Sequence, residues 1–165
     1  MNKPPLVAPA IDSRASFAAA LRWAFEQSIE RRARVITCAD PDFADWPLDD
    51  SALQSRLTGW LRLPKRRLVL LAADYDEMPR RHARFAAWRV DWSHAIDAFS
   101  PPDDLKAELP SVFVDDADLS VELIDAVHWR GRVDIDARSA QLWRERIDVL
   151  LQRSEPAFPV NPLGL

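Results

Sequence analysis

The hydrophobic pattern of the chain alternates between segments typical of helices and segments typical of strands. In four segments apolar residues recur at three- and four-residue steps, as one buried helical stripe requires. These segments begin near Ser13, Ser51, Pro79 and Asp136. Mostly apolar runs at residues 35–39, 68–73, 96–99 and 111–116 predict strands. The alternation of the two patterns predicts parallel β/α units in the first hundred residues.

Residues 121–135 follow a different pattern, in which apolar and polar residues largely alternate. A single strand of that length, at about 3.4 Å per residue, would far exceed the usual length of about 17–20 Å. We therefore expect two strands that meet near Asp125 and Ala126. The prediction is an α/β fold: a mixed β-sheet with helices on both faces and an antiparallel edge. One domain is expected over residues 12–155, between an N-terminal segment (1–11) and a proline-rich tail (156–165).

Composition and charge limit the classes of protein to which this chain can belong. The chain has 165 residues, of which 48% are hydrophobic, so it can bury a core. Its single cysteine, Cys38, and the absence of a long apolar segment favour a cytoplasmic protein. With three glycines, none in a Gly-rich phosphate loop, a nucleotide-binding loop is excluded. The net charge of −4 disfavours a dedicated nucleic-acid binder.

The order of elements and three short stretches carry a family resemblance. The stretches are residues 42–62, residues 79–85 with the helix that follows, and residues 143–156. On these the chain resembles an uncharacterised bacterial domain with a phospholipase-D-like fold that is often attached to acetyltransferase domains. The resemblance covers roughly residues 12–156 and implies half of a two-lobed phosphodiesterase fold. Active sites of that type form between two facing halves, so the resemblance also implies a homodimer.

The catalytic motif of that family, HxKxxxxD, is missing. If Asp115 is the motif aspartate, Glu108 and Pro110 stand where the histidine nucleophile and the lysine belong. If Asp116 is the aspartate, Leu109 and Ser111 stand there. Neither frame supplies a nucleophile or a cation, so the resemblance implies a pseudoenzyme.

Carboxylates at strand ends are the first candidate site. Asp40 and Asp74 each follow a buried strand directly, and parallel strands would bring both to one edge of the sheet, where open α/β folds bind ligands. Asp115 ends a third strand and could join them. Such a cluster could hold Mg²⁺. The alternative is that aspartate is simply common in turns after strands, and we predict no cofactor and no metal site.

Three further residues complete the candidate pocket. His82 is predicted in the first turn of a helix beside Arg81, where it could act as a general base or help to hold an anion. The alternative is a solvated helix turn. Trp46 lies in a proline-bounded loop near Asp40, either as a lid over a ligand or as a plug in the core.

Two basic runs precede two of the predicted strands. Arg31, Arg32 and Arg34 form the first, and residues 65–67 form the second. In a parallel sheet both would lie at the edge opposite Asp40 and Asp74, which gives the domain one basic and one acidic end. The runs either solvate loop ends or contact an acidic partner.

Two functions are compatible with these features. The first is a non-catalytic phospholipase-D-like binding or interaction module. It would form a homodimer or bind a protein partner, through Trp129 or the Phe158 region, with no membrane partner and with nucleic acid disfavoured. The alternative is a divergent metal-dependent phosphoesterase acting on a small phosphorylated or acidic substrate. A weaker third option is a domain that positions an acetyltransferase.

Overall fold

The computed structural model describes residues 6–160 and confirms the α/β fold. Its helices are α1 (Arg14–Glu30), α2 (Ser51–Leu61), α3 (Met78–Arg81), α4 (Ala83–Asp91) and α5 (Ala137–Gln152), with a 3₁₀ helix at Asp103–Glu108. Its strands are β1 (Val35–Asp40), β2 (Arg67–Ala72), β3 (Ile96–Ser100), β4 (Ser111–Asp115), β5 (Leu119–Asp125), β6 (Arg130–Ile135) and β7 (Glu155–Pro156).

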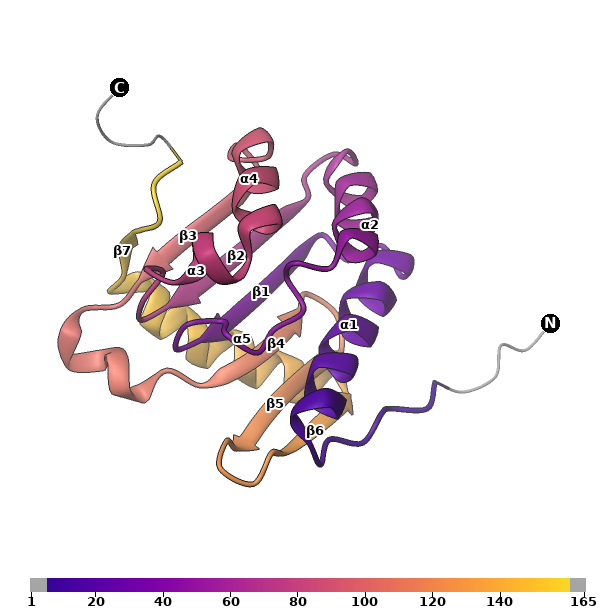
Figure 1. Cartoon of the computed structure of the whole chain (residues 1–165). Helices are drawn as coiled ribbons and strands as arrows, with labels where there is room; N and C mark the ends of the chain where they lie inside the picture. The colour runs from indigo at the N-terminus through magenta and orange to yellow at the C-terminus, as the bar shows by residue number, and fades with distance from the viewer. Residues whose placement is uncertain (1–5, 161–165) are drawn as a thin grey trace.

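The strands form one mixed sheet in the order β6-β5-β4-β1-β2-β3-β7. Strands β1, β2 and β3 are parallel, while β4, β5, β6 and β7 each run antiparallel to the neighbour they join. The chain therefore winds β1, β2, β3 in one direction and then crosses β1 to place β4 on its other side (Figure 1). We call the end of the sheet at the last residues of β1–β3 the carboxyl edge, and the opposite end the amino edge.

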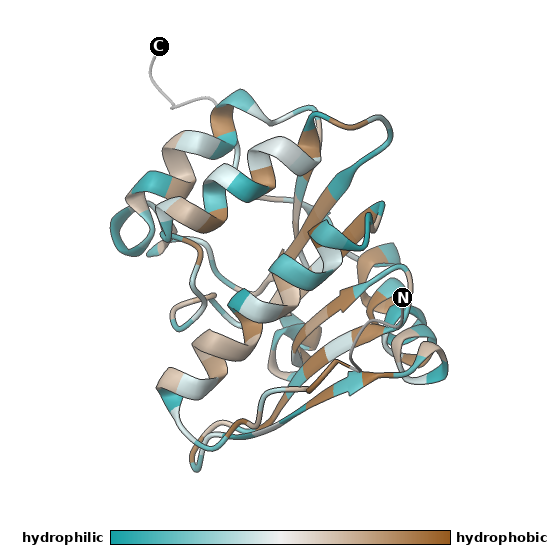
Figure 2. Ribbon diagram, turned by 90° about the vertical axis from the view of Figure 1, so that its right-hand side faces the viewer, coloured by the Kyte–Doolittle hydropathy of each residue, from teal (hydrophilic) through white to brown (hydrophobic). Residues whose placement is uncertain are grey.

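Helices cover both faces of the sheet. Helices α1 to α4 lie on one face and α5 lies alone on the other (Figure 1). Apolar residues are concentrated on the strands between these layers (Figure 2). The larger core lies under α1, α2 and α4 and includes Phe25, whose ring meets that of Phe113 edge to face at 4.9 Å. The smaller core packs Trp143 and Ile147 of α5 against β1, β2 and β4.

Side-chain caps explain where three helices begin. Ser13 forms a capping box with Ser16 at the start of α1, and Asp50 and Asp136 accept backbone N–H bonds at the starts of α2 and α5. The helix predicted from Pro79 is instead two helices. His82 takes a non-helical conformation (φ −126°, ψ 58°) and separates α3 from α4.

The outermost strands of the sheet include two that were predicted and one that was not. Residues 121–135 form two antiparallel strands joined by a turn after Asp125, as expected. The short strand β7 was not foreseen: Glu155 and Pro156 pair with the end of β3. At the other edge Ile11 forms a β-bridge with Gly131 of β6. Within residues 6–160 no helix has the length and hydrophobicity to cross a membrane.

The three glycines include a matched pair for testing this packing. A Cβ added at Gly131 would lie 2.6 Å from the carbonyl oxygen of Glu122 and 3.0 Å from Ile11, whereas one added at Gly59 would meet nothing within 4 Å. We expect Gly131→Ala to destabilise the protein by about 1–3 kcal/mol, because the clash is with backbone. Gly59→Ala, within α2, should stabilise it by about 0.5–1 kcal/mol. Urea unfolding of both variants measures the difference, and equal effects would contradict the β5–β6 register.

Candidate functional site

Asp40 ends β1 at the carboxyl edge, but its carboxylate serves the fold. One oxygen accepts the backbone N–H groups of Asp42 and Phe43, at 3.1 and 2.7 Å, and the other accepts the Ser111 hydroxyl at 2.5 Å. The residue is only 9% exposed. Burial raises the pKa of Asp40, and the hydrogen bonds from Ser111 and the backbone oppose that rise in part. Asp40 thus ties the loop after β1 to the start of β4.

Asp74 and Asp115 do not share a site. Asp74 follows β2 at the carboxyl edge, as predicted, and is exposed. Asp115 lies at the amino edge because β4 runs antiparallel to β1, which pairs Asp115 with Ile36. It is buried and accepts the hydroxyl of Ser28 at 2.8 Å. Placing Asp115 with the other two aspartates was therefore wrong. Within residues 6–160 no group of three His, Cys, Asp or Glu side chains could hold a metal ion.

Trp46 and His82 are both buried in the core. The Trp46 ring meets the rings of Phe43 and Phe17 edge to face, at 5.0 and 6.3 Å, so it is a plug and not a lid. The Nε2 atom of His82 lies 2.8 Å from the carbonyl oxygen of Phe43. The interpretation of His82 as a solvent-facing base is not supported, because it is only 6% exposed.

The first turn of α4 is also unable to hold a free anion. The Asp49 carboxylate accepts the backbone N–H groups of Arg84 and Phe85, at 2.8 and 3.0 Å, and so takes the position an anion would occupy. Arg81 is exposed at the end of α3. The predicted grouping of Arg81 and His82 around an anion is therefore wrong.

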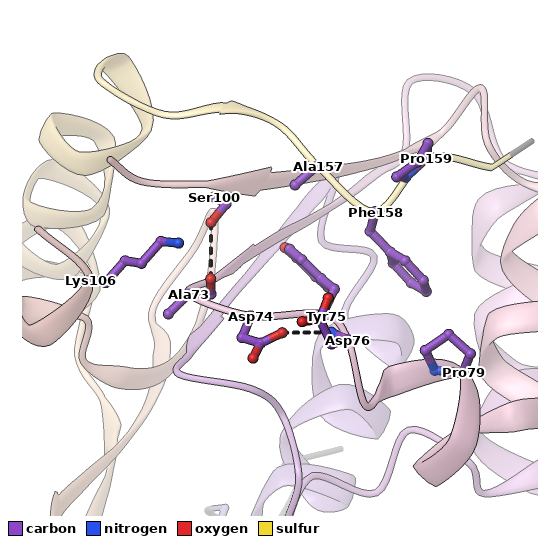
Figure 3. Close-up of a pocket in the computed structure, with 10 residues that line it drawn as sticks. All are labelled: Ala73, Asp74, Tyr75, Asp76, Pro79, Ser100, Lys106, Ala157, Phe158 and Pro159. Carbon is purple, nitrogen blue, oxygen red and sulfur yellow. Dashed lines mark hydrogen bonds between the residues drawn. The ribbon is translucent and has the colours of Figure 1, made fainter. Parts of the chain in front are cut away.

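A hollow lies at the carboxyl edge beside Asp74 (Figure 3). Its volume is about 760 Å³, and its wall is formed by the ends of β2 and β3, the 3₁₀ helix and the segment after β7. Its polar groups are Asp74, Asp76, Ser100 and Lys106, and its apolar wall includes Tyr75 and Phe158. The phenyl ring of Phe158 stacks on Tyr75 at 5.2 Å. The sequence indicated Asp74 as a site residue and the Phe158 region only as a possible dimer contact, because most of the wall comes from segments without a periodic pattern.

At the amino edge the two basic runs come together as predicted. The amide of Arg67 donates to the carbonyl oxygen of Arg34 at 2.9 Å, which places the turn before β1 beside the turn before β2. Arg31 pairs with Asp118 and Arg67 pairs with Asp97. Of the two basic runs, Arg32, Arg34, Lys65 and Arg66 form no ion pair with a carboxylate among residues 6–160. We call these four residues the basic edge.

The basic edge has an unusual backbone. Arg32 and Lys65 adopt left-handed conformations, with φ of 62° and 60°. Glycine is the residue that takes this conformation without a steric penalty, and an Arg or Lys there costs conformational energy. Both side chains are exposed. Arg32 and Lys65 thus occupy exposed turn positions at which glycine would have the lower conformational energy.

Comparison with known proteins finds solved structures of this fold. The sequence matches no family model and no curated protein sequence. The structure is similar to that of TrmBL2, an archaeal chromatin protein whose structure shows a novel mode of DNA binding, with a TM-score of 0.63 and 13% sequence identity. The match covers 94% of this chain and 56% of the chromatin protein, so the chain spans little more than half of that protein's length. At this identity the likeness establishes the fold.

The comparison corrects the functional interpretation. The similar protein is a DNA-binding chromatin protein, which contradicts the expected phospholipase-D-like interaction module, the alternative phosphoesterase and the pseudoenzyme reading. A bacterial source is unsupported. The view that nucleic acid is a disfavoured partner is also wrong. Both surfaces suggested for a homodimer contact their own chain, since Trp129 packs on Phe17 and Phe158 on Tyr75. The resemblance to the phospholipase-D-like domain itself stays a prediction.

Proposed function

We propose that this domain acts in association with DNA and contacts the phosphate backbone through the basic edge. The observation that carries the proposal is the meeting of two basic turns at one end of the sheet, in a fold shared with a DNA-binding chromatin protein. Lysine and arginine side chains that have no carboxylate partner are the groups that phosphates recruit. A cytoplasmic or nucleoid location follows from this proposal.

The overall acidity of the chain is compatible with this role. Carboxylates at the amino edge are engaged, since Asp118 pairs with Arg31 and Asp97 pairs with Arg67. Asp116 accepts the backbone N–H of Arg34. Carboxylates including Asp42, Asp74 and Asp76 lie at the carboxyl edge, far from the basic edge at the other end of β1 and β2. Six residues of strand, at about 3.3 Å each, place roughly 20 Å between the two ends. That distance exceeds the Debye length of about 8 Å at physiological salt, so the acidic end is screened from DNA at the basic edge.

The strain at Arg32 and Lys65 supports a functional role for these residues. A turn selected for stability alone would carry glycine at a left-handed position. Phe43, Trp129 and Phe158 also have positive φ, so this conformation alone does not mark a site. Arg32 and Lys65 differ from them in being exposed cations on two turns that meet in space.

The strain also allows a test that separates binding from folding. In the Arg32→Gly/Lys65→Gly double variant the two cations are lost while the backbone conformation is relieved, so stability should be unchanged or raised. DNA affinity should fall. Four phosphate contacts predict a slope of log K against log salt of about −3.6, and the double variant should reduce its magnitude by about 2. Fluorescence anisotropy with a labelled duplex, in a salt series, measures both quantities.

A matched control removes the same charge from the other end of the molecule. Arg80→Gln/Arg81→Gln changes two exposed arginines of α3 and gives the same net charge as the glycine double variant. It should bind DNA as the unaltered protein does. Equal loss of affinity in both double variants, or no binding by the unaltered protein at low salt, would contradict the proposal.

A further inference from the structure

We propose that the hollow at the carboxyl edge binds a small zwitterion, an α-amino acid with an apolar side chain. This inference is independent of DNA binding at the basic edge. Ligands of open α/β sheets bind outside the carboxyl ends of the strands. The hollow of about 760 Å³ lies at this edge of the sheet, at the ends of β2 and β3.

Groups of opposite charge face the hollow from different elements. Figure 3 shows the Lys106 side chain extending into the hollow from the 3₁₀ helix and the Asp74 carboxylate on its floor. One Asp74 oxygen accepts the backbone N–H of Asp76 at 2.7 Å, and the other has no hydrogen-bond partner among the described residues. The backbone bond holds the carboxylate in place and leaves a free acceptor for an ammonium group.

Lys106 is available for a carboxylate. Its ammonium group lies 3.0 Å from Asp103, but the Asp103 side chain is 97% exposed. An ion pair with so exposed a partner contributes little, because water and salt screen it. A ligand carboxylate that faces Lys106 from within the hollow would replace Asp103 at little cost.

The remaining wall suits an apolar side chain. The Phe158 ring, Tyr75 beneath it and Pro79 line the side of the hollow away from Lys106 (Figure 3). The wall is held in place from behind, since the Arg89 guanidinium lies 3.8 Å from the Phe158 ring centre and donates to the Phe158 carbonyl oxygen. The Tyr75 hydroxyl donates to the carbonyl oxygen of Phe99 at 2.8 Å. Tyr75 is buried beneath Phe158, so the exposed part of Phe158 and Pro79 are the apolar surface that a ligand meets.

The charge arrangement selects against simpler ligands. A phosphorylated or dianionic molecule would meet the carboxylates of Asp74 and Asp76, which line the same hollow. A simple amine would leave Lys106 without a ligand partner. A molecule that carries an ammonium and a carboxylate on one carbon, with an apolar group beyond, satisfies Asp74, Lys106 and the Phe158 wall together.

Calorimetric titration of the full chain with L-phenylalanine tests whether the hollow binds an apolar α-amino acid. We expect saturable binding with a Kd on the order of 1 mM, as suits a small ligand with few polar contacts. The same titrations use 3-phenylpropionate, which lacks the ammonium group, and 2-phenylethylamine, which lacks the carboxylate. Each should bind about tenfold more weakly or not at all, since each leaves one charged group without its partner.

Variants then assign the contacts. Asp74→Asn and Lys106→Met should each weaken L-phenylalanine binding by about tenfold or more, while Lys65→Met, a matched change at the basic edge, should not. Failure of all three ligands to bind at about 20 mM would overturn the proposal. Equal affinity for 2-phenylethylamine and L-phenylalanine would also overturn it. Neither result bears on DNA binding, which the anisotropy experiment reads separately.

Discussion

Replacing Phe113 by alanine is expected to lower the free energy of unfolding by about 3–5 kcal/mol. Phe113 is fully buried in β4, between Cys38 of β1 and Val121 of β5, and its ring packs edge to face on Phe25 of α1. Truncation removes buried apolar surface and leaves a cavity that the surrounding strands cannot close, because they are held by ladders on both sides. Chemical denaturation followed by tryptophan fluorescence measures the loss.

An alanine substitution at an exposed position of the next strand is the control. It separates the effect of lost burial on stability from the effect of lower strand propensity. Ile124 of β5 is 61% exposed, so Ile124→Ala should change the free energy of unfolding by no more than about 0.5 kcal/mol. A loss below about 1.5 kcal/mol for Phe113→Ala would contradict the packing of α1 on β4, since it is smaller than this class of substitution produces.

Replacing Asp40 by alanine is expected to cost about 3 kcal/mol, because three donors lose their acceptor at once. The backbone N–H groups of Asp42 and Phe43 and the Ser111 hydroxyl all point at this carboxylate. Asp40→Asn is the matched variant: its amide oxygen can accept from the two N–H groups, and its NH₂ can donate to Ser111. We expect Asp40→Asn to retain most of the stability that Asp40→Ala loses in urea unfolding.

The raised pKa of Asp40 also predicts how the difference in stability between the unaltered protein and Asp40→Asn changes with pH. A carboxyl group whose pKa is higher in the folded state than in the unfolded state stabilises the fold below the unfolded pKa. That contribution is lost as the pH rises through the folded pKa. The protein should therefore lose stability relative to Asp40→Asn as the pH rises from about 4. A difference that is constant across this range would show that burial does not penalise the Asp40 charge.

Local signals predicted the elements well. Ser13, Asp50 and Asp136 cap helices where the sequence indicated, and the alternating segment folds into two strands at Asp125. Capping and periodicity depend on near neighbours in the chain, so one sequence is enough to read them. The meeting of the two basic runs was also predicted. Each run directly precedes a strand, and parallel strands begin at the same edge of a sheet.

Long-range placement was beyond these signals. An apolar run does not state its direction, so Asp115 was grouped with Asp40 although β4 runs antiparallel to β1. His82 stands among arginines and reads as solvated, yet the loop after β1 covers it. Lys106 and Phe158 reach the hollow from irregular segments, whose positions depend on tertiary contacts and not on periodicity.

The chain covers part of the edge strand at each side of its sheet. Strand β3 would present an open row of backbone donors and acceptors, and Glu155 and Pro156 occupy the end of that row. Strand β6 has the same exposure, and Ile11 meets it at Gly131. Uncovered strands of this kind recruit strands from other molecules and lead to aggregation. The segments that flank the domain in sequence therefore protect its edge strands from pairing with other molecules. Shortening either segment would expose an edge strand and favour aggregation.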